Sequence, residues 1–134
     1  MIVYVITKSI AFSAGHRLDH LQVTHPCNQY HGHNYSVDVS VQCSTLSAVE
    51  EWVVDFGTLK RAIDGAYDHM NLNDVMDCHP TAENLSRVIW ELLQMVCVEQ
   101  RPGSDILVNA VTVYETPTSS ATYMPEQRHA VMGD

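Results

Sequence analysis

The most regular alternation in the chain, HNYSVDVSVQC at residues 33–43, is the feature that most constrains its fold. Tyr35, Val37, Val39 and Val41 alternate there with polar residues. Successive side chains of a strand point to opposite faces, so the pattern predicts a half-buried strand with one polar face.

Three further segments are predicted to be strands. Residues 2–12 are rich in β-branched and aromatic types, as are residues 106–115, and residues 119–124 follow a turn at Pro117. Between the first two strands, residues 13–32 are predicted to form a long loop, and loops of that length are more often functional than not.

Two helices are predicted between the two pairs of strands. The first begins near Asp55, a plausible N-cap, and carries apolar residues at helical spacing up to Met70. The turn NLND follows at residues 71–74. The second helix has Thr81 as its expected N-cap and ends before Pro102-Gly103, and its apolar stripe consists of Leu85, Val88, Ile89, Leu92, Leu93 and Val96.

The order ββααββ predicts an α+β fold, a four-stranded antiparallel sheet with two helices on one face. Such a sheet has two open edges, and its strands carry polar faces. Oligomerisation that closes several sheets into a β-barrel would account for both features. We expect a single domain over residues 1–124 and a C-terminal tail over residues 125–134.

The net charge of −9, with only seven basic residues, argues against a nucleic-acid surface and against binding to an anionic membrane. No stretch approaches the roughly 20 apolar residues of a membrane span. No CxxC pair occurs, and with no secretion signal we expect reduced thiols in a cytoplasmic protein. The cysteines are Cys27, Cys43, Cys78 and Cys97.

Three histidines, His16, His31 and His33, are predicted to form a metal site. His31 and His33 are two residues apart on extended backbone and therefore point to the same side, while Gly32 between them has no side chain to obstruct a ligand. His16 ends the first strand, so all three rings converge if the first two strands form a hairpin.

Three neutral imidazoles with an open fourth position are the arrangement of a catalytic zinc site, whereas a closed structural site needs a fourth protein ligand. The segment HGH alone would favour two solvated histidines. The third histidine and a nearby cysteine favour a metal instead. His20 and His25, in the middle of the loop, are competing ligands.

Four other residues are candidates for proton transfer or binding. Cys27 follows Pro26 in a polar loop near histidines, which favours a reactive thiol acting as base or proton donor; it could instead be a fourth zinc ligand or a buried structural cysteine.

Asp68 and His69 end the first predicted helix. A carboxylate beside an imidazole can fix the tautomer of the imidazole. Adjacent side chains on a helix face each other only where the helix unwinds, and the alternative is that the two residues simply cap the helix end.

Glu115 ends the third strand, where its carboxylate could accept two parallel hydrogen bonds from an N–H and an NH2 of a ligand, or could simply be exposed.

These motifs together resemble the 6-pyruvoyl-tetrahydropterin synthase superfamily over nearly the whole chain except its tail. Within it, they look most like the bacterial 6-carboxytetrahydropterin synthases of the queuosine precursor pathway. The segments that carry the resemblance are FSAGH (12–16), CNQYHGHNY (27–35), VVDFGTLK (53–60), DHMNLND (68–74), PTAENL (80–85) and YETPTS (114–119).

The resemblance implies the tunnelling fold, with homohexamers formed from two stacked trimers and active sites between subunits. By position, it implies that the three histidines bind Zn²⁺ and that Cys27 is the proton-abstracting thiol. It also implies that His69, supported by Asp68, is its relay partner and that Glu115 anchors the pterin.

The implied activity is that of a carbon–carbon lyase. It converts 7,8-dihydroneopterin triphosphate to 6-carboxy-5,6,7,8-tetrahydropterin, acetaldehyde and triphosphate. The alternatives are the pyruvoyl-forming synthase and a non-catalytic zinc-stabilised binding or assembly protein. Arg17, Lys8 and Lys60 are candidates for the triphosphate contacts by position only.

Overall fold

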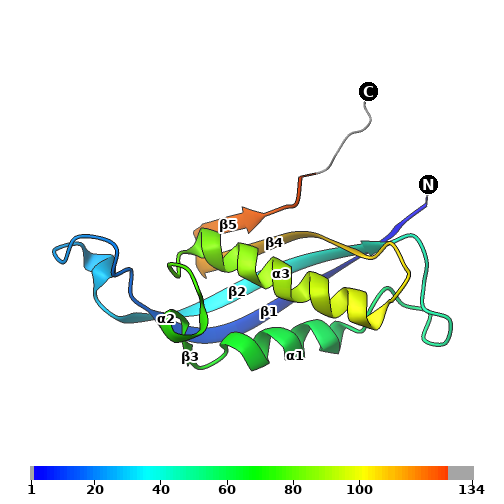
Figure 1. Cartoon of the computed structure of the whole chain (residues 1–134), viewed down its shortest axis with the longest axis horizontal. Helices are drawn as coiled ribbons and strands as arrows, with labels where there is room; N and C mark the ends of the chain where they lie inside the picture. The colour runs from blue at the N-terminus through cyan, green and yellow to red at the C-terminus, as the bar shows by residue number, and fades with distance from the viewer. Residues whose placement is uncertain (1, 127–134) are drawn as a thin grey trace.

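The computed structural model describes residues 2–126, in which a five-stranded mixed sheet has the order β3-β1-β2-β4-β5 (Figure 1). Four of the strands match the predicted ones: β1 (Tyr4–His16), β2 (His31–Cys43), β4 (Leu107–Thr116) and β5 (Ser119–Tyr123). They pair in antiparallel fashion, β1 with β2, β2 with β4, and β4 with β5. Of the predicted tail, only Pro125 and Glu126 lie within the described residues.

The alternation in β2 separates the two faces of the sheet as predicted. Val37, Val39 and Val41 are fully buried, whereas Asp38 and Ser40 on the other face are half-buried. Helices α1 (Phe56–Tyr67) and α3 (Ala82–Gln100) both cover the apolar face (Figure 1). Their fully buried contributions to the core are Leu59, Ile63, Leu85, Ile89, Leu93 and Cys97. The α+β class and the one-sided placement of the helices are therefore confirmed.

Both predicted N-caps are present. The Asp55 carboxylate accepts a hydrogen bond of 3.0 Å from the Gly57 amide, and the Thr81 hydroxyl accepts one of 3.1 Å from the Asn84 amide. Each satisfies one of the backbone donors that a helix leaves unpaired in its first turn.

The prediction of four antiparallel strands is wrong by one short strand. Strand β3 (Met70–Asn71) pairs in parallel with Ala14 and Gly15 of β1, and α2 (Leu72–Val75) follows it where a simple NLND turn was expected. The cause is local: His69 adopts a positive φ of 61°, and its amide donates a hydrogen bond of 2.6 Å to the Ser13 carbonyl. This contact directs the chain along the edge of β1.

The predicted loop at residues 13–32 is also shorter than expected, because both strands extend into it. The β1–β2 ladder continues without interruption to the pair His16–His31, so the connection covers residues 17–30 and contains the short 3-10 turn η1 (Pro26–Asn28). This loop projects beyond the end of the sheet (Figure 1). None of the helices within residues 2–126 has the length and apolarity that a membrane crossing requires.

Replacing the cap of α3 should measurably destabilise the fold. Thr81→Ala removes the hydroxyl that accepts from the Asn84 amide, and we expect the free energy of unfolding to fall by about 1 kcal/mol. Urea denaturation followed by circular dichroism measures the change. Thr24→Ala, in the exposed loop, is the matched control, and an equal effect of both variants would contradict the capping role.

Candidate metal centre and surrounding groups

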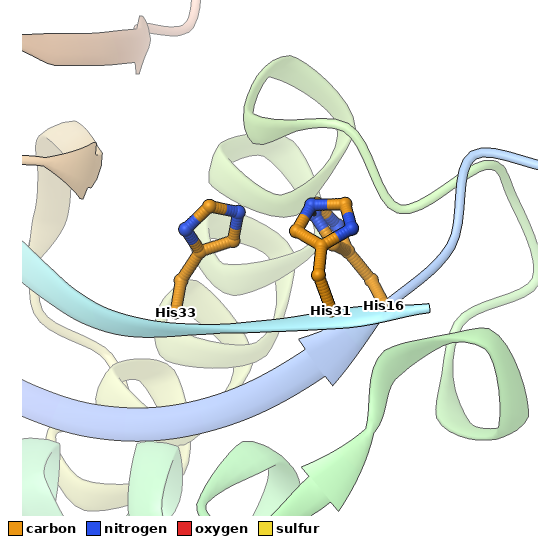
Figure 2. Close-up of side chains that lie close together, drawn as sticks. All are labelled: His16, His31 and His33. Carbon is orange, nitrogen blue, oxygen red and sulfur yellow. Dashed lines mark hydrogen bonds between the residues drawn. The ribbon is translucent and has the colours of Figure 1, made fainter. Parts of the chain in front are cut away.

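The three predicted ligand histidines lie together at the end of the β1–β2 hairpin. His16 is directly opposite His31 in the ladder, and His33 is two residues further along β2, so all three rings leave the same face of the sheet (Figure 2). Their nearest ring nitrogens all lie within 4.8 Å of one another. His16 is buried, and the other two are half-buried.

Backbone carbonyls determine the tautomer of two of these rings. Nδ1 of His16 is 2.7 Å from the Pro80 carbonyl, and Nδ1 of His31 is 2.7 Å from the Gln29 carbonyl. A carbonyl oxygen can only accept, so both Nδ1 atoms donate and both Nε2 atoms carry lone pairs. Carbonyls that hold the far nitrogen of an imidazole in this way are the usual second layer of a metal site.

The close approach of these ring nitrogens favours a proton or a metal cation between them. Nε2 of His16 and Nε2 of His31 are only 3.0 Å apart, so two lone pairs would face each other without a shared proton or cation. Nε2 of His33 is buried and has no hydrogen-bond partner among the described residues. Burial also lowers the pKa of His16, which favours the neutral form that binds metals. The residues present therefore fit a metal ion held by three imidazoles.

Glu115 lies beside the cluster rather than in open solvent. One carboxylate oxygen is 3.9 Å from Nε2 of His33, and the other is 4.0 Å from Nε2 of His16. Burial, together with the charge of Glu115, raises the pKa of the neighbouring Tyr35 hydroxyl, so this side chain stays neutral beneath the rings. Glu115 is thus half-buried rather than exposed.

Asp68 and His69 face each other because α1 ends there. Asp68 has left helical geometry, with ψ of 130°, and its Oδ2 atom is 3.0 Å from Nδ1 of His69. Its other oxygen accepts a hydrogen bond of 3.0 Å from the Ser13 amide. That backbone bond, and then the charge of His69, lower the pKa of the Asp68 carboxyl, which keeps it ionised. The required unwinding of the helix is therefore present.

His69 and the metal cluster open to different faces of the sheet. His69 lines a hollow of about 620 Å³, together with Ser13, Gly15, Gly32 and Asn34, and these strand residues alternate with the three clustered histidines. Its ring is 82% exposed. His33 also borders the hollow, but no contact joins the ring of His69 to the three-histidine cluster among residues 2–126.

Cys27 lies in η1, within the projecting loop, and is half-buried. Its amide donates a hydrogen bond of 3.1 Å to Nδ1 of His25, and its carbonyl accepts one of 2.9 Å from the Leu18 amide. Among residues 2–126 its thiol is not part of the ligand group formed by the three histidines, so it does not close the site as a fourth ligand. The neighbouring His25 does not belong to that group either.

An amide network that the sequence did not reveal holds this loop in place. The side chain of Asn28 is 5% exposed; it accepts a hydrogen bond of 2.8 Å from Nε of Arg17 and donates one of 2.7 Å to the Leu21 carbonyl. Asn73 exchanges two hydrogen bonds of 2.8 Å with the backbone of Arg17. Asparagine is common in loops for many reasons, so its identity alone gave no signal of this role.

The comparisons with known proteins cover nearly the whole chain. A family model described as 6-pyruvoyl tetrahydropterin synthase matches residues 5–126. The 6-carboxy-5,6,7,8-tetrahydropterin synthase of Bacillus subtilis (strain 168) is 30% identical over an alignment of 133 positions that covers 92% of this chain and 87% of that protein. The 6-pyruvoyl tetrahydrobiopterin synthase of Homo sapiens is 32% identical over an alignment of 139 positions that covers 90% of this chain and 91% of that protein.

A solved structure, that of Caenorhabditis elegans 6-pyruvoyl tetrahydropterin synthase, is similar in fold. It superposes with a TM-score of 0.73 at 26% identity, and the match covers 94% of this chain and 98% of that one. Two further relatives, from Aquifex aeolicus and a Synechocystis strain, are also named 6-carboxy-5,6,7,8-tetrahydropterin synthase.

The ionised state of Asp68 should make stability depend on pH. Its pKa is lower in the folded chain than in the unfolded one, so its contribution is present above the unfolded value near 4 and is lost as pH falls through the folded value. The melting temperature of Asp68→Asn should therefore lie below that of the wild type at pH 7, and the gap should narrow as pH falls below the unfolded value near 4.

Melting curves from pH 7 to pH 2.5 measure this gap. Asp77→Asn, at an exposed acid in the segment before α3, controls for the loss of one surface charge. A gap between the wild type and Asp68→Asn that stayed constant over the whole range would contradict the role of the ionised carboxylate.

Proposed function

The chain belongs to the 6-pyruvoyl tetrahydropterin synthase family and is a lyase of that family, and from this premise we propose that it is a zinc-dependent 6-carboxytetrahydropterin synthase. The proposed reaction converts 7,8-dihydroneopterin triphosphate to 6-carboxy-5,6,7,8-tetrahydropterin, acetaldehyde and triphosphate. The observation that carries the proposal is the three-histidine cluster with Glu115 beside it, in a chain whose bacterial relatives bear the carboxy-forming name.

His16, His31 and His33 are the proposed ligands of Zn²⁺. When bound, the ion would act as a Lewis acid that acidifies hydroxyl groups of the substrate side chain and polarises a carbonyl formed from them. The support for these ligands is the pair of carbonyl-fixed tautomers and the unpaired Nε2 of His33.

The remaining groups would bind the substrate and move protons. Glu115 would hold the N–H and NH2 edge of the pterin through its two oxygens, close to the ligand histidines. Cys27 would take a proton from the substrate side chain and His69 would pass a proton on, with Asp68 keeping Nδ1 of that ring protonated. Moving protons between side chain and ring shifts oxidation state within the substrate, so no nicotinamide or flavin is required.

A neighbouring subunit would complete this site. In one chain the ring of His69 lines a hollow on the far face of the sheet, and the thiol of Cys27 lies in the projecting loop. We propose a homohexamer, a dimer of trimers with barrel-closed sheets, in which these groups meet across subunit boundaries. Such an assembly would also cover the open edge of β1, which pairs with β3 at only two residues among those described.

Product analysis tests the proposed reaction. We expect purified protein incubated with 7,8-dihydroneopterin triphosphate to release acetaldehyde and 6-carboxytetrahydropterin, measured by mass spectrometry. Full triphosphate release without acetaldehyde would instead establish the pyruvoyl-forming reaction, which the 32% identity to the human synthase keeps as the second candidate.

Cys27→Ala should lower kcat about 100-fold or more, whereas Cys78→Ala should not; equal activity of both variants would exclude the thiol from the chemistry.

Metal content tests the proposed ligands separately. We expect His31→Ala to bind about one zinc ion fewer per chain than the wild type, measured by mass spectrometry of the metal in dialysed protein. His25→Ala removes a histidine of the loop that precedes β2 and should leave the metal content unchanged. A His31→Ala protein with the full wild-type content would exclude this residue as a ligand.

A further inference from the structure

A second group of metal-ligating side chains lies outside the site described above. It consists of Asp19, His20 and His79, whose nearest ligand atoms all lie within 4.8 Å of one another. The rings of His20 and His79 stack with their centres 3.9 Å apart, and Nδ1 of His79 is 4.0 Å from a carboxylate oxygen of Asp19. Two segments far apart in the sequence meet here, the projecting loop after β1 and the segment between α2 and α3.

The surroundings of this group have room for a hydrated ion. Asp19 and His79 border a hollow of about 370 Å³, which is also lined by the polar residues Asn73, Asp77 and Asn84. The side chains of Asp19 and His79 are 56% and 55% exposed, and His20 is exposed as well. The stacked rings can therefore turn toward one ion without disturbing the core.

The donor set determines the kind of ion. Two imidazoles and one carboxylate suit borderline divalent transition ions such as Zn²⁺, Co²⁺ or Ni²⁺, and three protein donors leave positions for water. The positive end of α3, which begins shortly after His79, would repel a cation. The carboxylates of Asp19 and Asp77 border the same hollow, in a chain of net charge −9, and counter this repulsion. A bound ion would contact both imidazoles and the Asp19 carboxylate directly, whereas without an ion the two rings only stack on each other.

We propose that Asp19, His20 and His79 form a second binding site for a divalent transition-metal ion. This site does not depend on the proposed catalytic activity. All three of its side chains are exposed, whereas His16 of the first cluster is buried and His31 and His33 are half-buried, so we expect the second site to bind an ion more weakly.

A bound ion would join the projecting loop to the segment before α3. His79 is already fixed on the helix side, because its carbonyl accepts hydrogen bonds of 2.9 Å from the Thr81 amide and from the Asn84 side chain. The residue after it, Pro80, supplies the carbonyl that holds the His16 ring. The second site would therefore fix the loop that carries Cys27 relative to the carbonyl that orients one ligand of the first site.

Metal counting on the full chain tests the proposal with Zn²⁺ as the probe. After equilibrium dialysis against excess Zn²⁺, we expect His20→Ala and His79→Ala each to bind about one ion fewer per chain than the wild type. His25→Ala and Asp77→Asn, which change a histidine of the same loop and an acid of the same hollow, should bind as many ions as the wild type. Equal counts in the wild type and in both histidine variants would overturn the proposal.

Two further measurements separate this site from folding defects and from the first site. His20 lies in an exposed loop, so the circular dichroism spectrum of His20→Ala should be that of the wild type while its second ion is lost. In the His31→Ala background, which lacks a proposed ligand of the first site, adding His79→Ala should still remove about one further ion. If the added substitution removes none, the second site does not exist, whatever the outcome at His31.

Discussion

The register of the β1–β2 ladder is the constraint on which the rest of the structure depends. It places His16 opposite His31 and Gly15 opposite Gly32, and the same alternation buries Val37 and its neighbours beneath the helices. A slip of one residue would move the valines out of the core and the histidines to the other face. The burial that stabilises the fold and the convergence of the three rings are therefore consequences of one pairing, and neither can change without the other.

The orientation of the rings depends on a second, more distant element. Nδ1 of His16 donates to the carbonyl of Pro80, the residue just before the cap of α3, and the Thr81 hydroxyl fixes the first turn of that helix. The position of a ring nitrogen at the end of β1 is thus set by how α3 begins. This dependence gives the PTAENL segment a physical role beyond starting a helix, because its first carbonyl selects the tautomer of His16.

The features that could be predicted from the sequence are those governed by local periodicity. The alternation in β2, the apolar stripe of α3 and the spacing of His31 and His33 each depend on residues close together in the chain. What could not be predicted depends on backbone groups or on distant register. The carbonyls of Pro80 and Gln29 are independent of side-chain type, and β3 exists because His69 takes a positive φ and donates to Ser13.

The position of Glu115 also depends on distant strand register and therefore could not be predicted from the sequence. Its place beside the histidines follows from the pairing of Ser36 with Tyr114, which turns the next residue of β4 toward the face of Tyr35 and His33. The register of β2 against β4 shifts at a bulge near Ser40, and no local pattern announces such a shift. The sequence could therefore identify this glutamate as a candidate but could not place it beside the three histidines.

The open edge of β1 lies close to one of the proposed site residues, His69. Within residues 2–126, β1 is paired on its outer side only at Ala14 and Gly15, so most of a thirteen-residue strand presents unpaired backbone groups, and Tyr4 and Val5 are exposed near its start. An edge of this length is a strong template for pairing with another chain. His69 lies where this edge meets β3, so a copy that covers the edge of β1 also approaches the ring of His69. In the proposed assembly, the contact that pairs with this edge would therefore also bring a second chain close to His69.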